Sequence, residues 1–121
     1  MPHTSLSHLM AVVPVSDFDA AHLWYEQLFG RAADNLPMAG LLVEWQVTDS
    51  GWVQVTHNAE SAGTGLLDFA VDDLPQHLSE LAARGLPPGE IVQANKGARL
   101  STLNDPDGNT ITFIGGFRIE Y

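Results

Sequence analysis

The chain has 121 residues, which is enough for one domain with one hydrophobic core and too short for two ordinary domains. Hydrophobic residues make up 45% and charged residues 17%, a composition typical of a folded protein rather than a disordered one. Fifteen acidic and five basic side chains give a formal net charge of −10. This charge excludes nucleic acid and anionic membranes as partners, because both require a basic surface, and it favours a cationic ligand.

The sequence also lacks targeting segments and cysteine. No apolar run reaches the ~20 residues of a membrane span, and Met1 to Ser5 contain neither a basic region nor a long apolar one, so we expect no signal peptide. The absence of cysteine excludes disulfides, thiolate metal sites and a cysteine nucleophile. A reducing compartment fits this composition, and we expect a cytoplasmic protein.

The first thirty residues predict a strand and a helix. Residues 6–15 are apolar almost throughout, and their length suits a strand. Ser16 or Asp17 can cap a helix over residues 17–29, in which apolar side chains recur at helical spacing. Gly30 is a suitable residue to end this helix. The ten residues that follow are irregular and have room for a short strand.

Residues 41–48 and 52–57 predict a hairpin. They flank Asp49-Ser50-Gly51, a three-residue loop in which glycine supplies the left-handed conformation. This loop would pair Trp45 with Val55, and valines would accompany Trp45 on the face that packs under helices. The opposite face mixes amides, a carboxylate and a tryptophan, which suits a ligand better than a core. Its members are Leu42, Glu44, Gln46, Trp52, Gln54 and Thr56.

The second half repeats the order strand, helix, strands. Residues 58–64 are small and polar and predict a linker. A strand follows over residues 66–71, and Asp72 or Asp73 can cap a second helix that ends at Gly85. The remaining predicted strands cover 91–94, 99–103 and 110–114, and a tight turn joins the last two.

The closing turn is Asp105-Pro106-Asp107-Gly108-Asn109, and it leads into a strand of β-branched and aromatic residues. This motif resembles the closing signature of the vicinal oxygen chelate superfamily, which includes glyoxalases, bleomycin-resistance proteins and extradiol dioxygenases. The repeated element order supports the resemblance. So do the similar joints Val15-Ser16-Asp17-Phe18 and Val71-Asp72-Asp73-Leu74, although capping chemistry alone explains four residues equally well.

The resemblance implies an α+β fold in which two βαβββ modules form a cupped mixed sheet, with helices outside and a ligand in the cup. We expect a single domain over residues 1–121. Module 1 would cover about 6–57, the linker about 58–64 and module 2 about 65–115. Modules of this superfamily often pair across chains, so a homodimer is implied as well. The role of the tail, residues 116–121, stays open.

Superfamily enzymes hold one divalent metal through His, Glu or Gln side chains on the first and last strands of each module. The corresponding positions here are Met10, Gln54, Leu66 and Thr112. Only Gln54 is a usual ligand type. Because a thioether and an aliphatic side chain cannot hold a hard divalent cation, we expect no metal cofactor.

A displaced divalent metal site remains an alternative. His8, Glu44 and Asp68 would share the cup-facing side and offer one imidazole and two carboxylates. The other histidines, His22, His57 and His77, are expected at the surface. We assign no catalytic residue, although a buried Glu44 or Asp68 could act as an acid or base.

Three functions follow. The first is a metal-independent protein that sequesters a cationic or aromatic small molecule. It would be similar to bleomycin-resistance proteins, and this resemblance implies a role in antibiotic resistance. The second is a glyoxalase-like lyase, isomerase or dioxygenase with a displaced metal. The third is an interaction module whose own side chains fill the cup. For the first, Trp52 would stack on a ring, Glu44 and Asp68 would pair with cations, and Arg99 would meet any anionic group. The candidate ligand-binding residues are Met10, Glu44, Gln46, Trp52, Gln54, Leu66, Asp68, Arg99 and Thr112.

Overall fold

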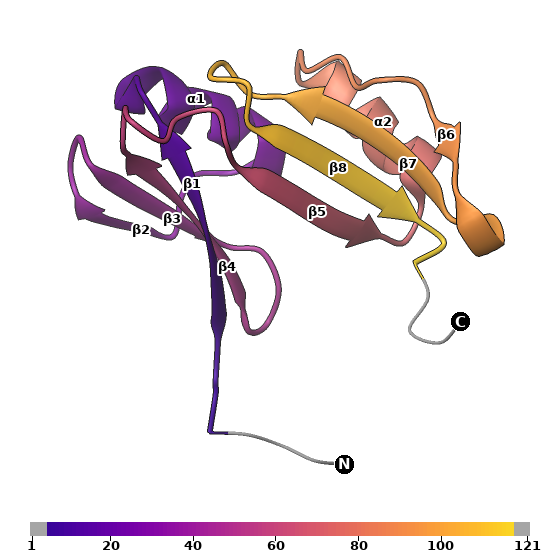
Figure 1. The fold of residues 1–121 in the computed structure, drawn as a ribbon, viewed down its shortest axis with the longest axis horizontal. Coiled ribbons are helices and arrows are strands. Elements are labelled where there is room, and N and C mark those ends of the chain that lie inside the picture. Colours follow the sequence, from indigo (N-terminus) through magenta and orange to yellow (C-terminus); the bar gives the residue numbers. More distant parts are fainter. Residues whose placement is uncertain (1–4, 118–121) are drawn as a thin grey trace.

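Two four-stranded mixed sheets lie side by side, and both helices lie behind them (Figure 1). The computed structural model describes residues 5–117. The expectations for the first four residues and for the tail beyond Phe117 lie outside this range. Within it, no helix has the length and apolar character that crossing a membrane requires. The α+β architecture inferred from the resemblance is confirmed.

The first module forms sheet 1, in the order β1-β4-β3-β2, with β1 parallel to β4. Its elements are β1 (Leu9–Val15), α1 (Phe18–Phe29), β2 (Asn35–Met38), β3 (Leu42–Gln46) and β4 (Gly51–His57). Of the two caps considered for α1, Asp17 is the one used, because its carboxylate accepts a hydrogen bond from the Ala20 N–H at 3.1 Å. Gly30 ends α1 in the left-handed conformation, as expected.

The second module repeats this order as sheet 2, β5-β8-β7-β6, with β5 parallel to β8. Its elements are β5 (Leu66–Val71), α2 (Leu74–Ala83), β6 (Val92–Gln93), a short 3₁₀ turn (Asn95–Gly97), β7 (Arg99–Asn104) and β8 (Thr110–Gly115). Asp73 caps α2 through the Gln76 N–H, so the two joints match in chemistry as well as in sequence.

The predicted register of the β3–β4 hairpin is wrong by two residues. Trp45 pairs with Val53, because the loop comprises Thr48 to Ser50 and Gly51 already belongs to β4. Val47 and Thr48 both donate their N–H groups to the Gly51 carbonyl, which makes a bulge opposite the glycine. A Cβ at residue 51 would lie 2.5 Å from the Thr48 hydroxyl, so glycine serves close approach here rather than a left-handed φ. A shift of two keeps every side chain on its predicted face.

One hydrophobic core joins the two modules on the helix side of the sheets. Trp45, Val43, Val53 and Val55 from sheet 1 are at most 1% exposed, as their predicted face requires. Residues from both helices and from sheet 2, among them Leu81, belong to the same cluster. The opposite side of both sheets carries no covering layer in Figure 1. This side corresponds to the cup of the expected fold and is called the outer face below, although the helices lie on the other side.

The closing motif fastens the second module to the first. Asp105 is buried and accepts four hydrogen bonds: from the backbone of Asp107 and Asn109, from the Asn109 amide and from the Tyr25 hydroxyl at 2.7 Å. Burial, and then the charge of Asp105, raises the pKa of Tyr25, so the phenol keeps the proton that it donates. Asn109 in turn donates to the Pro14 carbonyl.

Candidate functional site

Most of the side chains that the sequence predicts as ligand contacts lie on the outer face. Neighbouring residues of a strand point to opposite sides, so the register fixes which residues share a face with one another. On the outer side lie Met10 (β1), Glu44 and Gln46 (β3), Trp52 and Gln54 (β4), Leu66 and Asp68 (β5) and Thr112 (β8).

A polar network crosses sheet 1 and centres on Gln54. Its amide nitrogen donates to Glu44 Oε2 at 2.8 Å and lies 3.4 Å from the Met10 sulfur. Its amide oxygen accepts from the Thr56 hydroxyl at 2.7 Å. Glu44 Oε1 also accepts from the Asn35 amide at 3.3 Å, a contact that the sequence did not predict because β2 lies in an irregular stretch. The network holds the Glu44 carboxylate in place with amide donors rather than a cation.

A pocket of about 400 Å³ lies at the seam between the sheets and brings Trp52 together with Leu66 and Asp68. The seam is open because β1 and β5 are the facing edge strands and do not pair with each other. Trp52 is half-buried, whereas Leu66 is 79% exposed. The pocket therefore places an aromatic face and a carboxylate beside each other on different modules.

Thr112 continues the outer face across sheet 2. It stands opposite Asp68 on the parallel neighbour β5 and opposite Thr102 on β7. The two threonine hydroxyls lie 3.1 Å apart, so one donates to the other and leaves a further acceptor and donor for a ligand. Thr102, which the sequence did not nominate, shares this position because strand alternation places it there.

Two of the predicted ligand-binding residues, Arg99 and Gln46, are less available to a ligand on the outer face. Arg99 on β7 pairs with Gly115 on β8, so the two residues point to the same side of sheet 2. A Cβ at residue 115 would contact the Leu74 side chain on α2, which shows that this side faces the helices. We leave it out of the candidate site. Gln46 is on the outer face, but its amide donates to the Asp49 carbonyl at 2.9 Å and so closes the hairpin loop.

The charged groups at the rim of sheet 1 form a structural contact. Arg31 donates to both oxygens of Asp34, at 3.0 and 2.9 Å, and also to the Gln46 carbonyl. These hydrogen bonds from Arg31, followed by one from the Gln46 backbone, lower the pKa of Asp34. By contrast, Glu44 and Asp68 form no ion pair with any lysine or arginine within residues 5–117.

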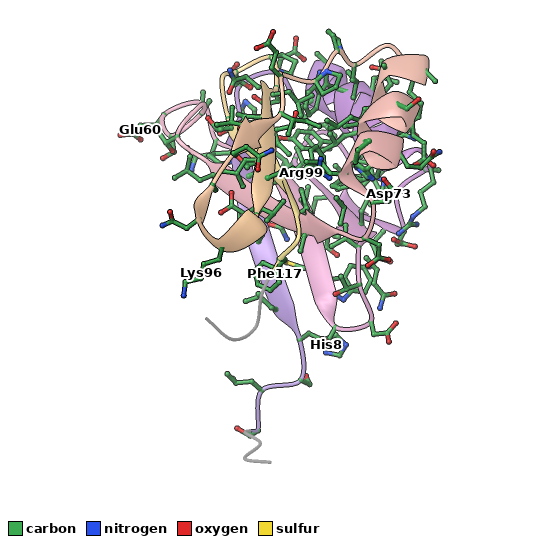
Figure 2. The ribbon with its side chains drawn as sticks, turned by 90° about the vertical axis from the view of Figure 1, so that its right-hand side faces the viewer. His8, Glu60, Asp73, Lys96, Arg99 and Phe117 are labelled. Atoms are coloured by element: carbon green, nitrogen blue, oxygen red, sulfur yellow. The ribbon has the colours of Figure 1, made fainter. Side chains whose placement is uncertain are left out.

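The histidines do not gather with the acidic residues. His8 directly precedes β1 in the chain and lies near the lower end of that strand in Figure 2, where its ring contacts the Ser7 hydroxyl. Among the residues that the structure describes, no three His, Asp or Glu side chains lie close enough together to hold a metal ion, so His8, Glu44 and Asp68 are not joined in one site. The expectation of surface histidines is wrong for His22, which packs 5.8 Å from Trp45, and for His77, which is half-buried.

The four positions at which superfamily enzymes hold a metal do not fit a hard divalent cation in this chain. Met10 and Leu66 offer no oxygen or nitrogen donor, and Thr112 offers a neutral hydroxyl. Gln54 is the one usual ligand type, and its amide oxygen already accepts a hydrogen bond from Thr56. The donor set instead suits hydrogen bonding and apolar contact with an organic molecule.

The arrangement matches a large family of known proteins. The model of the Glyoxalase/Bleomycin resistance protein/Dioxygenase superfamily matches residues 5–113. A glyoxalase/bleomycin resistance protein from Catenulispora acidiphila DSM 44928 is 31% identical, with a TM-score of 0.83 over 89% of this chain and 96% of that one. No protein among the curated ones matches the chain.

Two further solved structures share the fold at lower identity. TnmS3, an antibiotic binding protein from Streptomyces sp. CB03234, is 23% identical with a TM-score of 0.74, over 93% of this chain and 98% of that one. Lactoylglutathione lyase from Agrobacterium tumefaciens is 21% identical with a TM-score of 0.72, over 96% of each chain. The match of the family model over most of the chain, together with the duplicated sheets, shows that the protein belongs to the Glyoxalase/Bleomycin resistance protein/Dioxygenase superfamily.

Proposed function

We propose that the protein binds a small cationic or aromatic molecule on the outer face of its sheets, without a metal ion. The observation that carries this proposal is that a half-buried Trp52 and Asp68 line one pocket, while Glu44 lies on the same face of sheet 1. Neither carboxylate has a cationic partner within residues 5–117. A flat ring on Trp52 would gain about 0.5–1.5 kcal/mol beyond its buried area. The net charge of −10 would raise the local concentration of a cation.

The position of each polar group supports binding rather than catalysis. The oxygens of Glu44 are engaged by Gln54 and Asn35, which fixes the carboxylate as an acceptor at the floor of the face. The Thr102–Thr112 pair offers neutral hydrogen bonds on the far side of the seam. Sequestration of an antibiotic is consistent with this arrangement, and one protein of the same fold, TnmS3, is described as antibiotic binding.

Metal independence is part of the proposal and rests on the donor set. A thioether, an aliphatic side chain and a hydroxyl would compete poorly with water for a hard divalent ion. Protein purified without added ions should therefore contain no stoichiometric metal, and Ni²⁺, Zn²⁺, Mn²⁺ and Fe²⁺ should leave its melting temperature unchanged. Stoichiometric metal would favour the alternative, a glyoxalase-like lyase or a dioxygenase.

We further propose that two copies associate through the edge strands beside the seam. Leu9 and Val12 on β1 are 75% and 55% exposed, and Leu66 on β5 is 79% exposed. Unpaired edges that carry apolar side chains favour association with another chain. Light scattering should give a dimer that Val12→Lys dissociates. Leu23→Lys is the matched control, since Leu23 is 66% exposed but lies on α1. A monomeric wild type would contradict the proposal.

Ethidium, a flat cation, is a suitable probe of the ligand site, and an anionic dye, anilinonaphthalene sulfonate, provides the comparison. Fluorescence titration should show saturable binding of ethidium that Glu44→Gln weakens about three- to tenfold, the range for one partly shielded charge pair. Glu60→Gln makes the same change of charge at the linker, where Glu60 projects away from the body of the protein (Figure 2), and should have little effect. Equal loss in both variants, or preference for the anionic dye, would contradict the site.

A further inference from the structure

The Glu44 carboxylate on β3 lies between amide donors from the two neighbouring strands of sheet 1. On one side, β4 supplies the Gln54 amide, which donates to Oε2 at 2.8 Å. On the other side, β2 supplies the Asn35 amide, which donates to Oε1 at 3.3 Å. Each oxygen thus accepts one side-chain hydrogen bond within residues 5–117. A carboxylate has about four acceptor sites, two on each oxygen, so each oxygen of Glu44 keeps one site for a ligand.

Contacts at both ends of its amide hold Gln54 in this orientation. Its oxygen accepts from the Thr56 hydroxyl at 2.7 Å, and its nitrogen also lies 3.4 Å from the Met10 sulfur. A reversed amide would turn its oxygen toward the Glu44 carboxylate, and two acceptors would then face each other. Glu44, Gln54 and Thr56 are also half-buried. The carboxylate is therefore already positioned before a ligand binds, which lowers the entropic cost of binding.

The register brings Trp52 beside this carboxylate on the same face. Glu44 pairs with Gln54, and Trp52 is two residues before Gln54 on β4, so Glu44 and Trp52 are diagonal neighbours across the two strands. Diagonal neighbours of an antiparallel pair lie about 7–8 Å apart, within reach of an aromatic side chain. Trp52 is half-buried and keeps part of its surface open. One small molecule can therefore contact Trp52 with a ring and Glu44 with a cationic group.

The two open acceptor sites favour a planar cation that carries two parallel N–H groups. A guanidinium pairs with both oxygens of a carboxylate at once, and an amidinium presents the same pair of donors. A quaternary ammonium has no N–H group and would gain only the attraction between the charges. Within residues 5–117, no lysine or arginine of the protein pairs with Glu44.

We propose that the molecule bound on the outer face carries an aromatic ring joined to an amidinium or guanidinium group. The cationic group donates one N–H to each oxygen of Glu44, and the ring lies against Trp52. Thr56 is a positioning residue, since it acts on the carboxylate through Gln54 and does not touch the ligand. This inference rests on the proposed binding of a cation on that face and names the chemical class of the cation.

Benzamidine and phenyltrimethylammonium are the probes, because both are monocations with one phenyl ring and only benzamidine has N–H donors. Side-chain amide ¹H–¹⁵N spectra of the full chain should show saturable shifts of Gln54 and Asn35 with benzamidine. Benzamidine should bind about tenfold more tightly than phenyltrimethylammonium, the factor that one net hydrogen bond to a charged group supplies at the low end of its range. Glu44→Gln should remove this preference. The matched variant Asp68→Asn makes the same change of charge on sheet 2 and should retain it.

A second pair of variants tests the positioning role of Thr56. Thr56→Val removes the hydroxyl that holds Gln54 and should reduce the preference for benzamidine, whereas Thr56→Ser keeps the hydroxyl and should restore it. Equal loss in both variants would contradict this role, because a change in packing alone does not depend on the hydroxyl.

The comparison of the two probes on the wild type decides the inference even if a variant does not fold. If both probes bound equally tightly while ethidium still bound, this inference would fail and the proposed function would stand. Loss of the preference in Asp68→Asn would also overturn it, because the amidinium would then lie at the seam. If no cation bound at all, both the inference and the proposed function would fail.

Discussion

Asn109 joins the closing motif to Pro14 on β1 and to Gly65 just before β5, so its replacement tests how much this motif stabilises the fold. Asn109 is 1% exposed. Its amide nitrogen donates to the Pro14 carbonyl and to Asp105 Oδ2, both at 2.8 Å, and its oxygen accepts from the Gly65 N–H at 2.7 Å. Asn109→Ala removes all three hydrogen bonds, and at about 1 kcal/mol each the loss is roughly 3 kcal/mol.

This loss is large beside the roughly 5–15 kcal/mol that stabilises an ordinary domain. For a chain of 121 residues, 1 kcal/mol corresponds to about 4 °C in melting temperature, so Asn109→Ala should melt about 12 °C below the wild type. Calorimetry and urea unfolding followed by tryptophan fluorescence would measure both quantities. Asn104→Ala is the matched control in the same hairpin, because Asn104 is exposed and, within residues 5–117, its side chain accepts a hydrogen bond only from the Thr110 hydroxyl.

The control should change the free energy of unfolding by no more than about 0.5 kcal/mol. If Asn109→Ala proved as stable as Asn104→Ala, the closing motif would be an ordinary turn and the reasoning about module contact would be refuted.

Three further predictions concern polar groups that are buried or half-buried. Tyr25→Phe should destabilise the fold by roughly 1–2 kcal/mol in urea unfolding, because Asp105 loses a buried donor while its other hydrogen bonds remain; no loss would refute this. Arg84→Lys should cost roughly 1–2 kcal/mol in the same assay, since lysine cannot bond two α1 carbonyls with one planar group, and equal stability would show that the contact is dispensable. The pKa of His77 in the folded chain lies below its ordinary value of 6.5. As the pH falls toward 6.5 and below, the imidazole is therefore protonated more readily in the unfolded chain than in the folded one, which favours unfolding. Wild-type stability should therefore fall relative to His77→Gln between about pH 7 and pH 5, and a constant difference across this range would contradict the burial of His77.

The sequence predicted features that depend on local chemistry. Helix α1 and its end at Gly30 follow from capping and periodicity, which neighbouring residues determine. The two faces of β3 and β4 follow from alternation, so they survived the wrong register. The register itself failed because a bulge at Thr48 uses Gly51 for close approach, and composition alone does not distinguish that use of glycine from a left-handed turn.

Long-range features were less predictable. Asp105 and Asn109 read as turn residues, yet their partners Tyr25 and Pro14 are 80 and 95 positions away along the chain. The sequence did contain a signal for the burial of His77, because it lies three residues after Leu74 and four before Leu81 on the buried stripe of α2.

The central claim is that the outer face binds an organic cation with no metal ion present. Backbone ¹H–¹⁵N spectra of the protein, titrated with ethidium in the presence of EDTA, test this claim most directly. The account predicts saturable shifts concentrated around Glu44, Trp52, Gln54 and Asp68. It would be contradicted if those resonances stayed unchanged in EDTA and moved only after a divalent metal was added, or if the shifts lay on the helices instead.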